Sequence, residues 1–185
     1  LRELGVGAHV GGLLMGVTMH ADDMLLIAPT RGAMQQMLKV CEEYAVRYNI
    51  SFSTDPNPTK SKSKCIFMIG ERNNLTKPVN LMLCGNELPW VSTATHLGHE
   101  LHESGKMEHD AKVKWAEFID KAVEIRQTFG FASPVEVIQA LKTYCSSFYG
   151  SMLWNLSGGG ASQVFNSWNT TIKLAWFCPR DTRTY

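Results

Sequence analysis

The chain has 185 residues, and its 44% hydrophobic and 19% charged content is ordinary for a globular protein, which excludes a disordered or collagen-like chain. Its 18 Lys and Arg against 17 Asp and Glu give a net charge of +1, so any basic surface for nucleic acid or an anionic membrane must be local. Five cysteines without a CxxC pair fit reduced thiols in an intracellular protein better than a disulfide or zinc framework. The sequence begins at Leu1 without an export signal and reads as a fragment.

Two short apolar runs, residues 11–19 and 24–28, flank the polar tetrapeptide His20-Ala21-Asp22-Asp23. Runs of this length between Gly and Pro predict two buried strands of a hairpin, with the acids at its tip. Because the acids also interrupt the most apolar stretch of the chain, that stretch does not predict a membrane-spanning helix.

A helix is predicted after the hairpin, with Thr30 as its cap and its end near Asn49. Its apolar residues recur at spacings of three and four: Met34, Met37, Leu38, Cys41, Tyr44 and Ala45. The alternation in residues 50–53 predicts a strand, residues 55–58 a loop, and residues 65–69 a buried strand.

The next segment predicts a hairpin over residues 81–91 that turns at Gly85-Asn86, followed by a short strand through residues 95–97. The strand-rich part ends near His102. From Gly105 the pattern becomes helical, with acids four residues before bases, as in Asp110 and Lys114, on a long surface helix. Ser133 and Pro134 begin a second, buried helix, and residues 161–176 predict a third.

Asp22 and Asp23 are the strongest candidates for chemistry. Two adjacent carboxylates repel each other, and a divalent cation relieves the repulsion. Mg²⁺ takes few protein carboxylates and completes its coordination with water and substrate phosphates. The alternative is an ordinary solvated turn, in which Asp is common.

The wider sequence extends this interpretation. His20-Ala21-Asp22-Asp23 between two hydrophobic strands resembles the YxDD box, motif C, of reverse transcriptases. Residues 60–65, in which Lys and Ser alternate as far as Lys64, are similar to motif D of non-LTR retrotransposon polymerases, and residues 95–99 are similar to motif E. Residues 112–176 resemble the helical thumb and connection. The motifs follow the family's order, and the resemblance covers almost the whole chain.

The resemblance implies an α+β fold: residues 1–104 form part of a polymerase palm, an antiparallel sheet with a packed helix, and residues 105–185 a helical thumb-like region. It implies an RNA-directed DNA polymerase that uses an RNA template, a DNA primer, dNTPs and Mg²⁺ or Mn²⁺ for two-metal nucleotidyl transfer. The parent element acts in the nucleus and cytoplasm, with no membrane partner. The third catalytic aspartate, motif B and the fingers precede Leu1 in the family, so the isolated chain is expected to be inactive.

The resemblance also assigns roles. Asp22 and Asp23 are the catalytic metal ligands, with Asp22 the firmer, and His20 and Ala21 lie beside the nucleotide. His20 stands where the family has Tyr, which puts activity or fidelity in question. The phosphate-binding lysine is Lys60, chosen over the two lysines that follow it; all three also fit solvated loop charges.

Leu97 and Gly98 form the primer grip, although a strand bulge explains the Gly equally well. Two alternatives to a polymerase are a non-catalytic nucleic-acid-binding remnant and a functionless relic of a retroelement. A zinc hydrolase is disfavoured because His99-Glu100-Leu101-His102 is one residue too short for HExxH.

Overall fold

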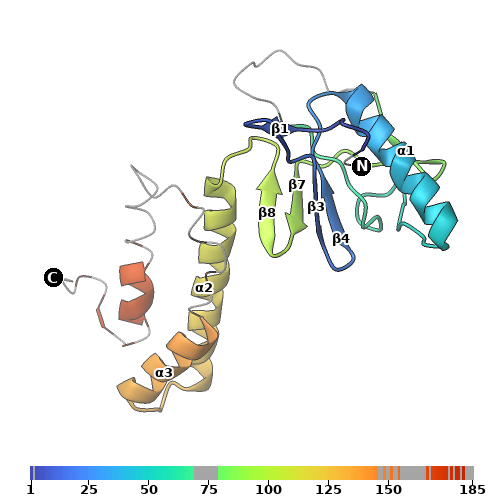
Figure 1. Cartoon of the computed structure of the whole chain (residues 1–185). Coiled ribbons are helices and arrows are strands. Elements are labelled where there is room, and N and C mark those ends of the chain that lie inside the picture. The colour runs from blue at the N-terminus through green and yellow to red at the C-terminus, as the bar shows by residue number, and fades with distance from the viewer. Residues whose placement is uncertain are drawn as a thin grey trace. The chain divides into compact units, whose positions relative to one another are not determined.

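The computed structural model describes residues 1, 3–68, 79–145, 148, 151, 154, 166, 168–174, 176, 178, 179 and 181. The described chain is mixed α+β, with short antiparallel strand pairs and helices (Figure 1), which confirms the expected class. It divides into two compact units. The first comprises Leu1–Leu97 and Leu101–Gly105, and the second comprises Gly98–Glu100 and Lys106–Tyr185.

The first unit opens with a hairpin that the sequence analysis missed. Strands β1 (His9–Val10) and β2 (Leu13–Leu14) are joined by Gly11 and Gly12, which have φ of 56° and 83°. Positive φ at both central positions is the type I′ pattern of two-residue hairpin loops, and glycine adopts it without steric cost. Residues 11–19 are therefore a turn and two strands, and the prediction of one continuous strand was wrong.

The predicted hairpin over the acidic tetrapeptide is confirmed. Strands β3 (Val17–His20) and β4 (Asp23–Leu26) pair antiparallel, with His20 opposite Asp23 (Figure 1). The expectation that both strands are buried was wrong, since Met19 is 67% exposed. A two-stranded sheet has little area for packing, and here only Val17 of β3 and the β4 residues that follow Asp23 are half-buried.

Helix α1 (Arg31–Tyr48) follows the predicted pattern. The Thr30 hydroxyl accepts a hydrogen bond from the Ala33 amide at 3.1 Å, and Asn49 ends the helix with a φ of 51°. The buried residues are Met37, Leu38, Cys41 and Ala45, whereas Tyr44, expected on the same stripe, is 54% exposed. Leu38 belongs to a buried cluster with Leu81, Leu83 and Leu88.

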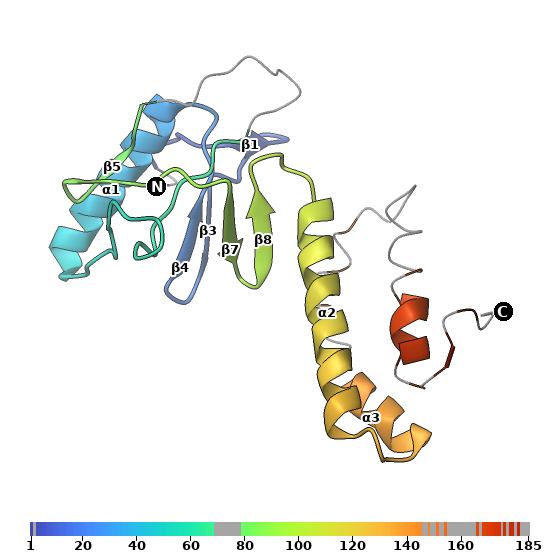
Figure 2. The ribbon, with the colours of Figure 1, turned by 180° about the vertical axis from the view of Figure 1, so that it is seen from behind.

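The hairpin of strands β5 (Met82–Leu83) and β6 (Asn86–Glu87) lies against α1 (Figure 2). It turns at Cys84 and Gly85, one residue earlier than predicted. The Gln35 side chain of α1 exchanges two 2.9 Å hydrogen bonds with the backbone of Met82, which occupies backbone groups of β5 that a neighbouring strand would otherwise bond.

Two predicted strands do not form. Residues 50–53 are irregular, and Cys65 makes only an isolated parallel bridge with Trp90. The end of the second predicted strand, Ile69, lies outside the described residues. Strands β7 (Thr93–His96) and β8 (His99–His102) form a further hairpin, and the expected short strand through residues 95–97 ends one residue early.

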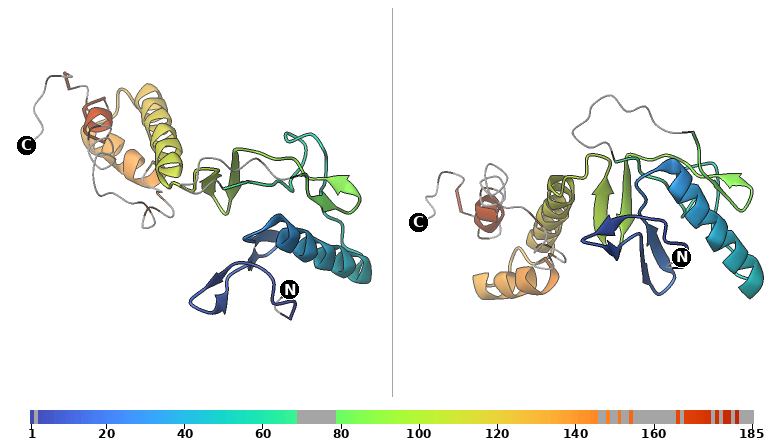
Figure 3. Two further views of the ribbon diagram at one scale, coloured as in Figure 1. Left: turned by 90° about the horizontal axis from the view of Figure 1, so that it is seen from above. Right: turned by 45° about the horizontal axis from the view of Figure 1, so that its top comes forward.

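The second unit contains helices α2 (Glu108–Thr128) and α3 (Pro134–Tyr144), joined by a short loop (Figure 3). Ser133 and Glu136 form a reciprocal capping box at the start of α3, as the sequence predicts. The prediction of a buried α3 was wrong, because Val137 is its one buried residue before the end at Tyr144.

The core of the second unit comprises Phe118, Ile125, Val137 and Cys145, with the rings of Trp115 and Phe148 packed against it. Of the predicted third helix, Asn166 and the run 168–174 are helical, and the remaining positions of that span are largely outside the described residues. In the described part of the chain, no helix is long and apolar enough to cross a membrane.

Candidate functional site

The predicted site begins at the apex of the β3–β4 hairpin. Ala21 and Asp22 are its two loop residues, and Ala21 has a φ of 52°. A positive φ at the first loop position alone fits a type II′ turn, where glycine is the usual residue. An alanine there carries backbone strain, of a kind that concentrates at functional sites.

The two apical carboxylates are open to solvent. Asp22 lies in the turn, and Asp23 is the first residue of β4, opposite His20. All three side chains are exposed. Neither carboxylate makes a hydrogen bond or an ion pair with any residue that the structure describes, so the oxygens of both are available to an external cation.

The base of the same hairpin is tightly packed. The Ala8 amide donates to the Ile27 carbonyl at 2.9 Å, and the Ile27 amide donates to the Gly16 carbonyl at 2.8 Å. Gly7 and Gly16 are buried, and a Cβ added to Gly16 would lie 2.9 Å from the Gly7 Cα. The chain crossing at the base therefore requires glycine, and it fixes the hairpin that carries the acids.

Lys60 lies on a different segment, a loop held by side-chain hydrogen bonds. The Asp55 carboxylate accepts from the Asn57 amide at 2.8 Å, and the buried Ser61 hydroxyl donates to the Ser63 carbonyl at 2.6 Å. The prediction that Lys60, Lys62 and Lys64 share one face of an extended segment is not met, because Lys60 is in a turn and Lys62 in a bend. All three lysines are exposed.

Leu97 and Gly98 form the turn between β7 and β8, with φ of 48° and 78°. This is a type I′ pattern, so Gly98 occupies a hairpin turn and not the strand bulge considered above. The structure thus brings His20, Ala21, Asp22 and Asp23 together on one hairpin. Lys60 lies on a separate loop, with no described hydrogen bond or ion pair to that hairpin.

The chemistry of the apex suits a hard divalent ion. Mg²⁺ binds through one or two carboxylates and keeps several water or phosphate ligands, and the free oxygens of Asp22 and Asp23 match that demand. The described side chains do not by themselves form a complete metal site. Among the described residues, no group of three or more His, Cys, Asp or Glu side chains could hold a metal ion.

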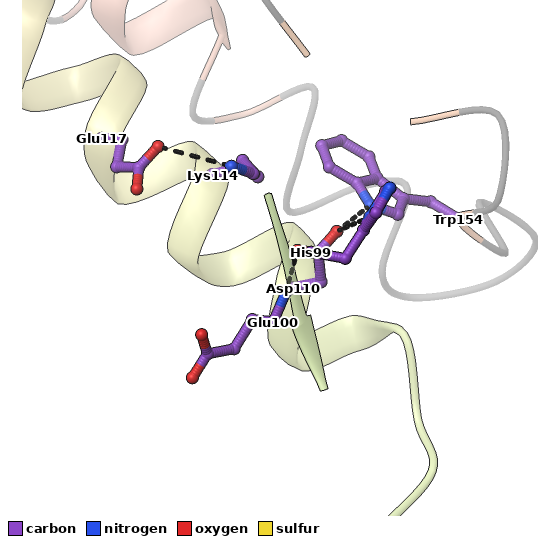
Figure 4. A network of polar contacts seen from close by, with 6 residues as sticks. All are labelled: His99, Glu100, Asp110, Lys114, Glu117 and Trp154. Carbon is purple, nitrogen blue, oxygen red and sulfur yellow. Dashed lines mark hydrogen bonds and ion pairs between the residues drawn. The ribbon is translucent and has the colours of Figure 1, made fainter. Parts of the chain in front are cut away.

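Asp110, on the first turn of α2, was missed by the sequence analysis. The prediction of a surface pair with Lys114 was wrong, because the Asp110 side chain is fully buried and Lys114 lies 3.8 Å from Glu117 (Figure 4). The Asp110 carboxylate accepts hydrogen bonds from the Glu100 amide at 2.9 Å and the Trp154 indole N–H at 2.8 Å.

His99 completes this network, with its Nδ1 3.7 Å from the Asp110 Oδ2. Burial raises the pKa of the Asp110 carboxyl. The two hydrogen bonds and the nearby His99 together lower the pKa by more than burial raises it, so the pKa lies below its usual value. The sequence offers one weak signal for this site. An acid in the first turn of a helix is favoured by the helix dipole, but that position is usually exposed.

Comparison with known proteins adds no assignment: no family model, no curated protein and no solved structure matches this chain. The resemblance to reverse transcriptases therefore depends on the motifs quoted from the sequence. The features whose chemistry bears on function are the apex, the lysine loop and the β7–β8 turn.

Proposed function

We propose that the chain is part of an RNA-directed DNA polymerase of the non-LTR retroelement kind, with Asp22 and Asp23 as its metal-binding carboxylates. The observation that carries the proposal is a pair of exposed carboxylates, with no hydrogen-bond or ion-pair partner among the described residues, at the apex of a tight hairpin between two apolar strands. A solvated turn explains exposure. It does not explain why a strained alanine holds two like charges at one apex.

Each residue has a distinct part in this proposal. Asp22, in the turn, and Asp23, at the start of β4, bind the ion from adjacent positions. Bound there, Mg²⁺ would supply activation of the primer 3′-hydroxyl and neutralisation of charge on the leaving pyrophosphate. His20 and Ala21 lie beside the nucleotide, and Lys60 contributes a point charge for its phosphates. The backbone of half-buried Leu97 and exposed Gly98, in the β7–β8 turn, contacts the primer strand.

Metal binding by the apex can be tested on the chain itself. Mn²⁺, a paramagnetic substitute for Mg²⁺, is expected to broaden the amide resonances of residues 20–24 before all others. D22N should abolish that selective broadening, whereas D120N, the same change at an exposed acid on α2, should leave it intact. Broadening of the apex that persists in D22N contradicts the proposal.

Catalysis needs the third aspartate that the resemblance places before residue 1. A longer chain that contains the upstream sequence should extend a DNA primer on an RNA template with Mg²⁺, and D22N should remove the product. Because His20 replaces the family's Tyr, the assay is also run with H20Y. No extension by either longer chain counts against the polymerase.

A second candidate is nucleic-acid binding without catalysis, favoured by three exposed lysines on one short loop. Under this candidate the affinity falls steeply with salt, by roughly one released counterion per phosphate contacted. Replacing Lys60, Lys62 and Lys64 with Gln should flatten the salt dependence and weaken binding. A functionless relic predicts neither metal nor nucleic-acid binding, together with aggregation through exposed apolar residues such as Val10, 67% exposed, and Leu13, 70% exposed.

A further inference from the structure

The buried carboxylate of Asp110 connects its own helix to the start of β8 and to Trp154, 44 residues later in the chain. It lies on the first turn of α2 and accepts hydrogen bonds from the Glu100 amide, near the start of β8, and from the Trp154 indole (Figure 4). His99 Nδ1 lies 3.7 Å from the same carboxylate. The acid therefore holds two consecutive residues of β8, one through its backbone and one through its side chain.

A buried acid of this kind is costly without compensation. Transfer of a carboxylate out of water is unfavourable unless hydrogen bonds or opposite charge offset it, and here two N–H donors bond to the carboxylate and the His99 ring lies 3.7 Å away. Its position near the N-terminus of α2 adds favourable interaction with the helix dipole. An apolar residue would avoid the desolvation cost, so the carboxylate needs an explanation beyond filling space.

We propose that Asp110 is a positioning residue for nucleic-acid binding: it fixes His99 and Glu100 at the start of β8, so that the adjoining Gly98 of the β7–β8 turn presents one backbone conformation to the primer strand. This inference rests on the proposed function, which assigns Gly98 to primer contact. All of the residues involved belong to the second compact unit. Asp110 acts through His99 and Glu100 and does not touch the nucleic acid itself.

The test measures binding of the full chain to a labelled primer–template duplex of RNA and DNA, at one fixed salt concentration. D110A removes the acceptor from the Glu100 amide, and we expect binding to weaken about fivefold or more. D120A is the matched control because Asp120 is exposed on the same helix and its loss changes the net charge equally. D120A should bind as tightly as the unmodified chain, or more tightly.

A purely structural role predicts a different result, and W154F separates the two. This change removes one donor to the Asp110 carboxylate but keeps both contacts to β8, so it should lower thermal stability and leave duplex affinity within about twofold. Amide hydrogen exchange at Glu100 should accelerate in D110A and stay slow in W154F. If D110A does not fold, D110L provides the same comparison, because leucine is similar in size to aspartate and has no acceptor for the Glu100 amide.

Equal duplex affinity in D110A or D110L and the unmodified chain overturns the inference and leaves the polymerase proposal intact. The inference is also overturned if duplex affinity falls in proportion to thermal stability in both D110A and W154F. Failure of the unmodified chain to bind the duplex also overturns the inference, whatever Mn²⁺ does at the β3–β4 apex. Conversely, duplex binding that depends on Asp110, without Mn²⁺ binding at Asp22, contradicts the catalytic proposal and leaves the inference about Asp110 intact.

Discussion

The packing at the base of the β3–β4 hairpin makes a quantitative prediction for G16A. The added Cβ would lie 2.9 Å from the Gly7 Cα, 3.0 Å from the Ala8 nitrogen and 3.1 Å from the Ile27 oxygen. All three are backbone atoms, so relief requires movement of the chain and not of a flexible side chain. Overpacking of this kind costs about 1–3 kcal/mol, partly offset by about 0.4–1 kcal/mol from the stiffer unfolded chain.

The net loss expected for G16A is about 1–2 kcal/mol, which is a factor of about 5–30 in the opening equilibrium of the hairpin base. The assay is amide hydrogen exchange at Ala8 and Ile27, whose hydrogen bonds cross that base. G32A is the control, because a Cβ on Gly32 meets no atom within 4 Å and the residue lies in α1. Unchanged exchange at both amides in G16A, or equal acceleration in G32A, refutes the reasoning.

Three further predictions follow from single contacts. T30A removes the cap of α1 and should lower the unfolding free energy by about 0.5–2 kcal/mol in urea titration; no loss contradicts the cap. The folded pKa of Asp110 lies below its ordinary 3.8, so the ionised carboxylate should stabilise the fold fully above that pH, and this stabilisation should be lost as the pH falls through the folded pKa. Urea titrations from pH 6 to 2 should show the loss in the unmodified chain and not in D110N. Maleimide should label exposed Cys84 before Cys65, whose pKa burial raises to about 11, and the reverse order refutes it.

The sequence predicted best those elements whose causes are local. Helix α1 begins at the residue after Thr30 and ends at Tyr48, because a hydroxyl cap and a left-handed Asn49 act within one turn of each end. The capping box of Ser133 is local in the same sense. The acidic hairpin was also found, since apolar runs around a polar turn need no distant information.

Predictions that depended on distant partners were less accurate. Residues 50–53 alternate like a strand but have no pairing partner among the described residues, and Cys65 finds only Trp90. A strand requires a neighbour, and the sequence pattern does not say where that neighbour lies. The prediction of an exposed Asp110 was wrong for the same reason, because the burial of this side chain depends on Trp154, 44 residues away.

The contrast between Asp110 and Asp22 indicates where each kind of chemistry can occur. Both oxygens of Asp110 accept hydrogen bonds and the side chain is fully buried, so a metal ion could reach it only after those bonds break. Asp22 has no such partner among the described residues and lies at an exposed turn. A carboxylate whose hydrogen bonds are satisfied stabilises a fold, whereas one kept open beside a second acid is suited to bind an ion. The same residue type therefore has an architectural role in the second unit and, in the proposed function, a ligand role in the first.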